Sequence, residues 1–187
     1  MRIKRRLFME PSENKWESHA VLNPSVIIEK DIEHIFYRAV AKNMVSSIGY
    51  ARVENGKIER FDKPIIEPKL KYEKKGIEDP RVTKVGNKYY MLYTAFDGKN
   101  ARIAYAVSRN LKDWEKMGTI SPCVPVNEAR KLVKIKKYKD KWKNQEIFGS
   151  KVCIWDKDAI LFPEKIDGKF VMLHRFIPDI QILKFRS

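Results

Sequence analysis

Two stretches of the sequence repeat one pattern at one spacing, and this repeat constrains the fold more than any other feature. The first stretch begins at Asn23 and the second at Asp79, each followed by Pro and, two positions later, by Val. The interval from Asn23 to Tyr37 is the same as the interval from Asp79 to Tyr93. Equal intervals between matching residues indicate duplicated structural units rather than a shared composition.

A third copy begins at Asp158, and its matching apolar residue, Leu173, follows after an interval that is one position longer. Every copy continues into another short apolar segment, at residues 48–51, 103–106 and 180–183. Turn signals separate the segments: Asn55-Gly56, Asp97-Gly98 and Asp167-Gly168. Short alternating segments between such turns predict strands, so each copy predicts an antiparallel meander.

A meander that recurs roughly every 40 to 60 residues is typical of a β-propeller, in which each copy is one blade. Three copies nearly fill the 187 residues. A closed propeller usually needs at least about four blades. We therefore expect an all-β fold, an incomplete propeller of about three blades, in a single domain over residues 1–187. An all-β sandwich stays open as an alternative, although it would not explain the equal intervals.

A segment rich in Lys and Arg, at about residues 123–150, separates the second and third copies. Within it, residues 127–143 have a helical or irregular pattern and carry eight basic residues against two acidic ones. Its two aromatic residues, Tyr138 and Trp142, are too few for a base-stacking platform. We expect a solvated insertion here and regard nucleic acid as an unlikely partner.

The formal net charge of +15 is consistent with an anionic partner, although Lys-rich surfaces also occur in heat-adapted proteins. No run of 18 apolar residues predicts a membrane span, and no apolar stretch follows the basic start at residues 1–6. We therefore expect a cytoplasmic protein with no membrane partner. Cys123 and Cys153 lack metal-ligand spacing, and disulfides are unusual in a reducing compartment, so we predict two free thiols, buried or half-buried.

If the copies are blades, two sets of polar residues occupy equivalent positions: Asn23, Asp79 and Asp158 on the first strands, and Arg38, Thr94 and His174 on the second strands. Such residues would converge on the propeller channel, where ligands bind. An Asn or Asp before Pro is also a common turn device, so for any one of them a structural role stays open.

Several longer motifs extend this picture, at residues 72–83 (with Glu78-Asp79-Pro80-Arg81), 89–95, 108–114 and 157–175. Together they resemble the signature of glycoside hydrolase family 130, the β-mannoside phosphorylases and related mannosidases. The resemblance covers about residues 20–178 apart from the insertion, and it implies a five-bladed propeller. After Pro178 the sequence leaves the common pattern, so we expect the last one or two blades to be missing.

The resemblance implies an inverting transfer of mannose from a β-mannoside to inorganic phosphate, which gives α-mannose 1-phosphate. Inversion needs a general acid at the leaving oxygen and a nucleophile on the opposite face of the sugar. Phosphate is already anionic at neutral pH, so one carboxylic acid and a group of cations suffice. By resemblance Asp79 is this acid and acts through a hydroxyl of the bound mannose.

The resemblance also gives the remaining site candidates. Substrate contacts are expected from Asn23, Arg38, Glu78, Arg81 and Asp158. Phosphate contacts are expected from Arg102, Lys157, His174 and Arg175, because Arg and Lys make strong charge-assisted hydrogen bonds to phosphate. The expected partners are a β-mannoside oligosaccharide and phosphate, with phosphate as co-substrate and no metal or other cofactor.

Two alternatives for the function stay open. A hydrolase of the same fold would use water activated by a carboxylate, and a non-catalytic carbohydrate-binding fragment would have no activity. The sequence also departs from the family, which often has Arg where this chain has Ser47. An exposed blade edge near the end of the sequence predicts a homo-oligomer formed by strand pairing.

Overall fold

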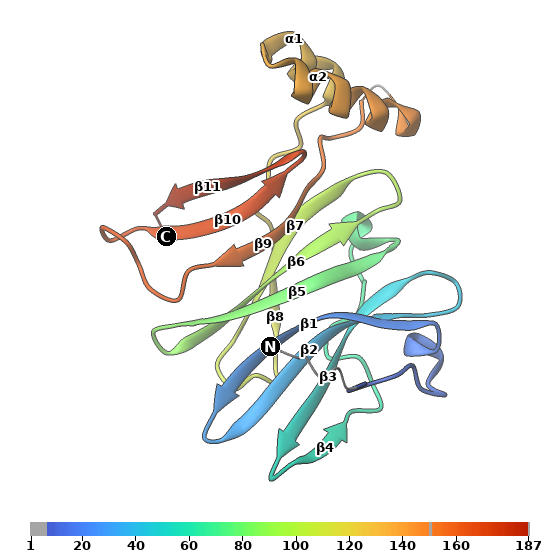
Figure 1. Cartoon of the computed structure of the whole chain (residues 1–187), viewed down its shortest axis with the longest axis vertical. Helices are drawn as coiled ribbons and strands as arrows, with labels where there is room; N and C mark the ends of the chain where they lie inside the picture. Colours follow the sequence, from blue (N-terminus) through green and yellow to red (C-terminus); the bar gives the residue numbers. More distant parts are fainter. Residues whose placement is uncertain (1–6, 150, 187) are drawn as a thin grey trace, which may run out of the picture.

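The computed structural model describes residues 7–149 and 151–186, and this part of the chain is mostly β-strand (Figure 1). Three successive antiparallel meanders, here called units 1, 2 and 3, correspond to the three predicted copies. Unit 1 contains β1 (Ala20–Glu29), β2 (Ile32–Val40), β3 (Ser46–Glu54) and β4 (Lys57–Arg60). Unit 2 contains β5 (Gly76–Val85), β6 (Lys88–Phe96), β7 (Ala101–Ser108) and β8 (Glu115–Thr119). Unit 3 contains β9 (Asp156–Leu161), β10 (Phe170–Phe176) and β11 (Asp179–Phe185).

Units 1 and 2 share one eight-stranded sheet, and a single parallel bridge between Ser46 and Gly76 connects them. Gly76 has φ +134°, and a Cβ atom there would lie 2.6 Å from the backbone nitrogen of Ser46. Only glycine therefore lets the two units meet at this point. Unit 3 forms a separate sheet, and within the described residues none of its strands pairs with unit 1. The units follow one another from the bottom of Figure 1 to its upper left.

The first strand of every unit has the same irregularity. Asn23, Asp79 and Asp158 have φ of 48°, 54° and 55°, in the left-handed region, and the strand register shifts beside each of them. Asn and Asp tolerate this conformation better than other residues with a Cβ atom. The polar residues that begin the copies therefore lie at β-bulges, which redirect side chains.

The hydrophobic core lies between the units. We call the face of a unit that packs on the next unit its forward face, and the opposite face its back face. The forward face of unit 1 (Phe36, Ile48, Tyr50) packs on the back face of unit 2 (Val82, Met91, Tyr93). The forward face of unit 2 (Leu92, Ile103, Tyr105) packs on the back face of unit 3 (Leu161, Met172). Burying each large apolar side chain stabilises the fold by about 1.5–3 kcal/mol.

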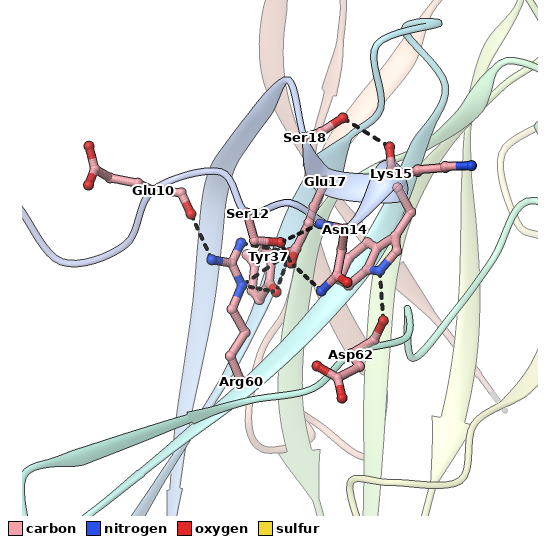
Figure 2. A network of polar contacts seen from close by, with 10 residues as sticks. Glu10, Ser12, Asn14, Lys15, Glu17, Ser18, Tyr37, Arg60 and Asp62 are labelled. Carbon is pink, nitrogen blue, oxygen red and sulfur yellow. Dashed lines mark hydrogen bonds and ion pairs between the residues drawn. The ribbon is translucent and has the colours of Figure 1, made fainter.

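A buried carboxylate strengthens the back face of unit 1 (Figure 2). Glu17, in the 3₁₀ turn η1 (Lys15–Glu17), is fully buried. Its Oε2 accepts hydrogen bonds from the Tyr37 hydroxyl at 2.8 Å and from Arg60 Nη2 at 2.7 Å. Burial raises the pKa of Tyr37, so this hydroxyl stays protonated and donates. We call this set of Glu, Tyr and cation the anchor.

Unit 2 has the same anchor. Glu73, in η2 (Lys71–Glu73), is fully buried, accepts from the Tyr93 hydroxyl at 2.9 Å and is paired with Lys116. The same sequence interval separates the members of three pairs, Glu17 and Glu73, Tyr37 and Tyr93, and Arg60 and Lys116. It is also the interval from Asn23 to Asp79. The duplication therefore begins before Asn23, at the turn that precedes each unit.

The insertion, predicted to be helical or irregular, forms two short helices, α1 (Val126–Leu132) and α2 (Lys136–Lys143), followed by η3 (Asn144–Phe148). Val126, Ala129 and Trp142 pack with Val152 and Ile154 into a small core of its own. Most of its basic side chains are exposed. No helix in the described part of the chain is both long enough and apolar enough to cross a membrane.

The prediction of two free thiols is wrong, because Cys123 and Cys153 form a disulfide. Backbone hydrogen bonds from Val126 to Val152 and from Ile154 to Val124 bring the two ends of the insertion side by side. Since the cysteines are far apart in the sequence, only the folded path of the insertion shows that they meet.

The predicted alignment of the third copy is also wrong. Strand pairing places Arg38 opposite Leu22, Thr94 opposite Glu78 and Arg175 opposite Lys157. Arg175, rather than His174, is thus the equivalent of Arg38, and His174 takes the place of Tyr37 and Tyr93. The cause is a longer hairpin, since the interval from Asp158 to Arg175 exceeds the interval from Asn23 to Arg38 by two positions.

Candidate active site

Polar side chains from units 1 and 2 meet at Asp79, which lies on β5 and is 9% exposed. Asn23 Nδ2, from β1, donates to Asp79 Oδ1 at 2.6 Å, and Arg38 Nη1, from β2, lies 3.6 Å from the same oxygen. Asp79 Oδ2 accepts no hydrogen bond from residues 7–149 or 151–186. One carboxylate oxygen is thus held in place while the other remains available to a ligand.

Glu78 extends this cluster to unit 3. Arg38 Nη2 donates to Glu78 Oε1 at 2.9 Å, and Lys157 Nζ, from β9, lies 3.6 Å from Glu78 Oε2. The side chains of Arg38, Glu78 and Lys157 are 21%, 11% and 16% exposed. One connected set of contacts, Asn23–Asp79–Arg38–Glu78–Lys157, therefore joins all three units; we call it the acid cluster.

The β-bulge on β5 explains how two consecutive acids share one cation. In a regular strand, successive side chains point to opposite faces, so Glu78 and Asp79 would lie apart. The left-handed conformation of Asp79 interrupts this alternation, and the register shifts between Glu78 and Arg81. Arg38 consequently contacts both carboxylates.

Arg81 holds the backbone around this cluster. Its Nη1 donates to the carbonyl oxygens of Asn23, Pro24 and Pro80 at 3.2, 3.4 and 2.8 Å. These bonds link the bulge of β1 to the bulge of β5. Arg81 thus positions Asn23 against Asp79.

The other candidates of unit 3 form two pairs near Lys157. Arg175 is paired with Asp158 at 2.5 Å, and both side chains are more exposed than those of the acid cluster, at 40% and 36%. His174 Nδ1 is bonded to Asp156 Oδ1 at 2.8 Å. Asp156 is buried, and burial raises the pKa of its carboxyl despite the hydrogen bond from His174. No hydrogen bond or ion pair between described residues connects either pair to Asp79.

Arg102 lies apart from the other candidates. Its Nη2 donates to Thr119 Oγ1 at 2.6 Å and to the carbonyl oxygen of Ser121 at 3.2 Å. No hydrogen bond or ion pair in the described chain connects it to the acid cluster or to the candidates of unit 3. The structure therefore does not bring Arg102 together with the rest.

Two residues near the site were not predicted. Ser46 is fully buried, and its Oγ accepts from Arg38 Nε at 3.0 Å, so it orients the guanidinium. Asp156 orients His174. Ser46 had no signal in the sequence, because its contact depends on the bridge to Gly76. Asp156 had none either, because the β-bulge at Asp158 interrupts the alternation of side chains along β9. Among the described residues, no group of three or more His, Cys, Asp or Glu side chains is arranged to hold a metal ion.

Residues 3–185 match the sequence profile of glycoside hydrolase family 130, described as beta-1,4-mannooligosaccharide phosphorylase. The chain belongs to this family. Two proteins of Thermoanaerobacter sp. (strain X514) are each 36% identical to it. A 1,2-beta-oligomannan phosphorylase matches over 94% of this chain and 53% of its own length, and a beta-1,2-mannobiose phosphorylase over 97% and 56%. This family member thus spans about half the length of these relatives.

Solved structures share the fold. A glycosyl hydrolase from Bacteroides ovatus superposes with a TM-score of 0.72 and 22% identity, over 96% of this chain and 53% of that one. Beta-1,2-mannobiose phosphorylase from Listeria innocua, in complex with beta-1,2-mannobiose, superposes with a TM-score of 0.64 and 19% identity, over 90% and 57%. The predicted family resemblance is confirmed.

Proposed function

We propose that this family 130 protein is a β-mannoside phosphorylase that transfers mannose from a β-1,2-mannoside to inorganic phosphate. The acid cluster is the observation that carries the proposal. It places Arg38 beside Asp79, whose second carboxylate oxygen has no hydrogen bond from the described residues, and it reaches the cation of Lys157 through Glu78. The names of the two Thermoanaerobacter relatives support the substrate class. We further propose that units 1 to 3 are three blades of the family's five-bladed propeller.

In this proposal Asp79 is the general acid. Its protonated carboxyl gives a proton to a hydroxyl of the bound mannose, and that hydroxyl passes its own proton to the glycosidic oxygen. The glycosidic C–O bond breaks, and its electron pair stays with the leaving sugar's oxygen. A phosphate oxygen attacks the anomeric carbon from the opposite face and forms the new C–O bond of α-mannose 1-phosphate. Asn23, Arg38 and Arg81 hold the acid and the sugar.

Unit 3 supplies the phosphate contacts in this proposal. Lys157 and Arg175 are directly opposite each other on β9 and β10, so both side chains lie on one face of the sheet. Two neighbouring cations suit a phosphate dianion, and Arg adds a bidentate fork. Glu78 and Asp158 pair with these cations in the free protein, and phosphate would compete for them. The contacts of Arg102 give no support for a similar role.

The test is turnover of β-1,2-mannobiose by the purified chain, with and without phosphate, with mannose 1-phosphate as the measured product. We expect release that requires phosphate, and a rate about 10²- to 10⁴-fold lower in Asp79→Asn, which removes the proton donor. Asp167→Asn, at an exposed turn, is the matched control and should keep the wild-type rate. Free mannose formed without phosphate would instead identify a hydrolase. A folded protein without any turnover would favour a carbohydrate-binding role and overturn the proposal.

A further inference from the structure

Trp155 directly precedes β9, and its half-buried indole ring lies beside Lys157 of the acid cluster. Lys157 Nζ lies over this ring, 5.9 Å from the ring centroid. The same ammonium group lies 3.6 Å from Glu78 Oε2. An ammonium group over a Trp ring is attracted by the electron-rich face of the ring, more strongly where water is partly excluded. The Lys157 side chain is only 16% exposed, so the ring and Glu78 together fix its position.

Unit 2 and the insertion both hold the Trp155 ring in place. Its Nε1 donates to the carbonyl oxygen of Lys99, in the turn between β6 and β7, at 2.8 Å. The ring centroid lies 5.3 Å from that of Phe148, in η3 of the insertion. It also lies 6.0 Å from the centroid of Phe96, at the end of β6, with an interplanar angle of 76°. The indole is therefore a fixed surface for the side chain of Lys157.

The backbone around Trp155 is held as well. Trp155 N donates to Gln145 Oε1 at 3.2 Å, and the Trp155 carbonyl oxygen accepts from Ile177 N at 3.2 Å. Two positions earlier, Cys153 N donates to Asn100 Oδ1 at 2.8 Å. These bonds fix the segment that leads into β9 without using Lys157.

A neutral ring suits a lysine that must bind an anion. Lys157 has a long flexible stem and an ammonium group with three hydrogen-bond donors. A carboxylate such as Glu78 competes with phosphate for these donors and offsets the positive charge. The face of an aromatic ring attracts the ammonium group while leaving its charge and its donors to the ligand.

We infer that Trp155 is a positioning residue for phosphate binding, because its ring holds the Lys157 ammonium group at the site without neutralising it. The inference rests on the proposed function, in which Lys157 contacts phosphate. Since Phe148 supports the ring, the insertion also contributes to the site through Trp155.

The experiment measures the affinity of the full chain for mannose 1-phosphate by titration calorimetry. Trp155→Leu should weaken binding by about 3- to 10-fold, as expected for the loss of a cation–π contact. Trp155→Phe keeps an aromatic face but loses the hydrogen bond to Lys99, and it should stay within about 2-fold of the wild type. Trp16→Leu is the matched control and should bind like the wild type, because Trp16 is also half-buried and its Nε1 donates to the carbonyl oxygen of Asp62.

A double-mutant cycle separates positioning from a merely structural role. If the ring acts through Lys157, Trp155→Leu should weaken binding no further in a Lys157→Met background. A loss of the same size in both backgrounds would overturn the inference, and so would wild-type affinity in Trp155→Leu. A wild type that does not bind mannose 1-phosphate, or wild-type affinity in Lys157→Met, would instead overturn the proposed phosphate contact and the inference together.

Ring-fluorinated tryptophan at position 155 keeps the test independent of folding defects. Fluorine withdraws electron density from the ring face while the size of the side chain and its N–H group are retained. Binding should weaken progressively as the number of fluorine atoms rises, because the cation–π attraction falls. An affinity that does not change along this series would contradict the role of the ring.

Discussion

Units 2 and 3 place different chemistry at the same position of the repeat. In unit 2, Tyr93 donates to Glu73, which comes from the turn before the unit and is also paired with Lys116. In unit 3, His174 takes the place of Tyr93 and bonds to Asp156 on the adjacent strand of its own sheet. The unit 2 anchor therefore ties a connecting segment to the sheet, whereas the His174–Asp156 pair lies wholly within the sheet.

The segments that precede the units also differ. Before unit 3 the connecting segment is the basic helical insertion, and a disulfide between Cys123 and Cys153 joins its two ends. The buried ion pairs of units 1 and 2 thus tie a connecting segment to the sheet, whereas the disulfide joins the two ends of the insertion to each other. We infer that units 1 and 2 are stable in reducing and oxidising solutions alike, whereas the attachment of the insertion depends on oxidation.

The largest effect should come from breaking the anchor. Glu73→Ala leaves Lys116 and the Tyr93 hydroxyl without their buried partner, and we expect the free energy of unfolding to fall by about 3–5 kcal/mol. Urea denaturation followed by circular dichroism measures it. The exposed control Glu54→Ala should change the value by less than about 0.5 kcal/mol. A loss no larger than that of the control would show that the anchor does not stabilise unit 2.

A smaller effect should follow loss of the disulfide. We expect Cys123→Ser combined with Cys153→Ser to lower the free energy of unfolding by about 2–4 kcal/mol. Dithiothreitol should reproduce this loss in the wild type and leave the double variant unchanged. Loss of the disulfide should accelerate hydrogen exchange of the backbone amides more in α1 and α2 than in β2 and β6. Equal acceleration in all three units would contradict the assignment of the disulfide to the insertion.

The smallest effect concerns Asp156. Since burial raises the pKa of this carboxyl above its usual 3.8, the folded protein favours the protonated form more than the unfolded chain does. The stability that the protonated Asp156 carboxyl contributes is fully present below about pH 3.8, and it is lost as pH rises through the pKa of the folded state. The Asn side chain in Asp156→Asn stays neutral at every pH. We therefore expect the free energy of unfolding of this variant to rise relative to the wild type as pH rises across this window. The change should be smaller than the one caused by loss of the disulfide.

Urea denaturation at a series of pH values measures this difference. Asp140→Asn, at an exposed position of α2, is the control and should follow the wild type at every pH. A constant difference between Asp156→Asn and the wild type would contradict the assigned direction of the pKa.

The sequence predicted the units because the interval from Asn23 to Tyr37 recurs unchanged from Asp79. It did not predict the register of unit 3. There His174 replaces the Tyr and the hairpin is longer, so no matching residue fixed the alignment of the second strand. The anchors also have a signal in the sequence, because Glu17 and Glu73 are separated by the same interval as Asn23 and Asp79, but both residues lie before the point at which the predicted units begin.

For the site, the sequence named Asn23, Arg38, Glu78, Asp79 and Lys157, and the structure brings these five into contact. Ser46 could not be predicted, because its position beside Arg38 depends on two units meeting at one bridge. The disulfide could not be predicted either, because Cys123 and Cys153 meet only when the insertion folds. In each case the missing information was a contact between segments that the repeat pattern does not relate.

The most direct test of the claim that three units build one site is the affinity for mannose 1-phosphate, measured by titration calorimetry. Lys157 is the residue of unit 3 that reaches the acid cluster, so Lys157→Met should weaken binding by about 10- to 100-fold, as expected for the loss of a charged hydrogen bond. Lys141→Met, at an exposed position of the insertion, should bind like the wild type. Wild-type affinity in Lys157→Met would show that unit 3 takes no part in the site and would contradict the account.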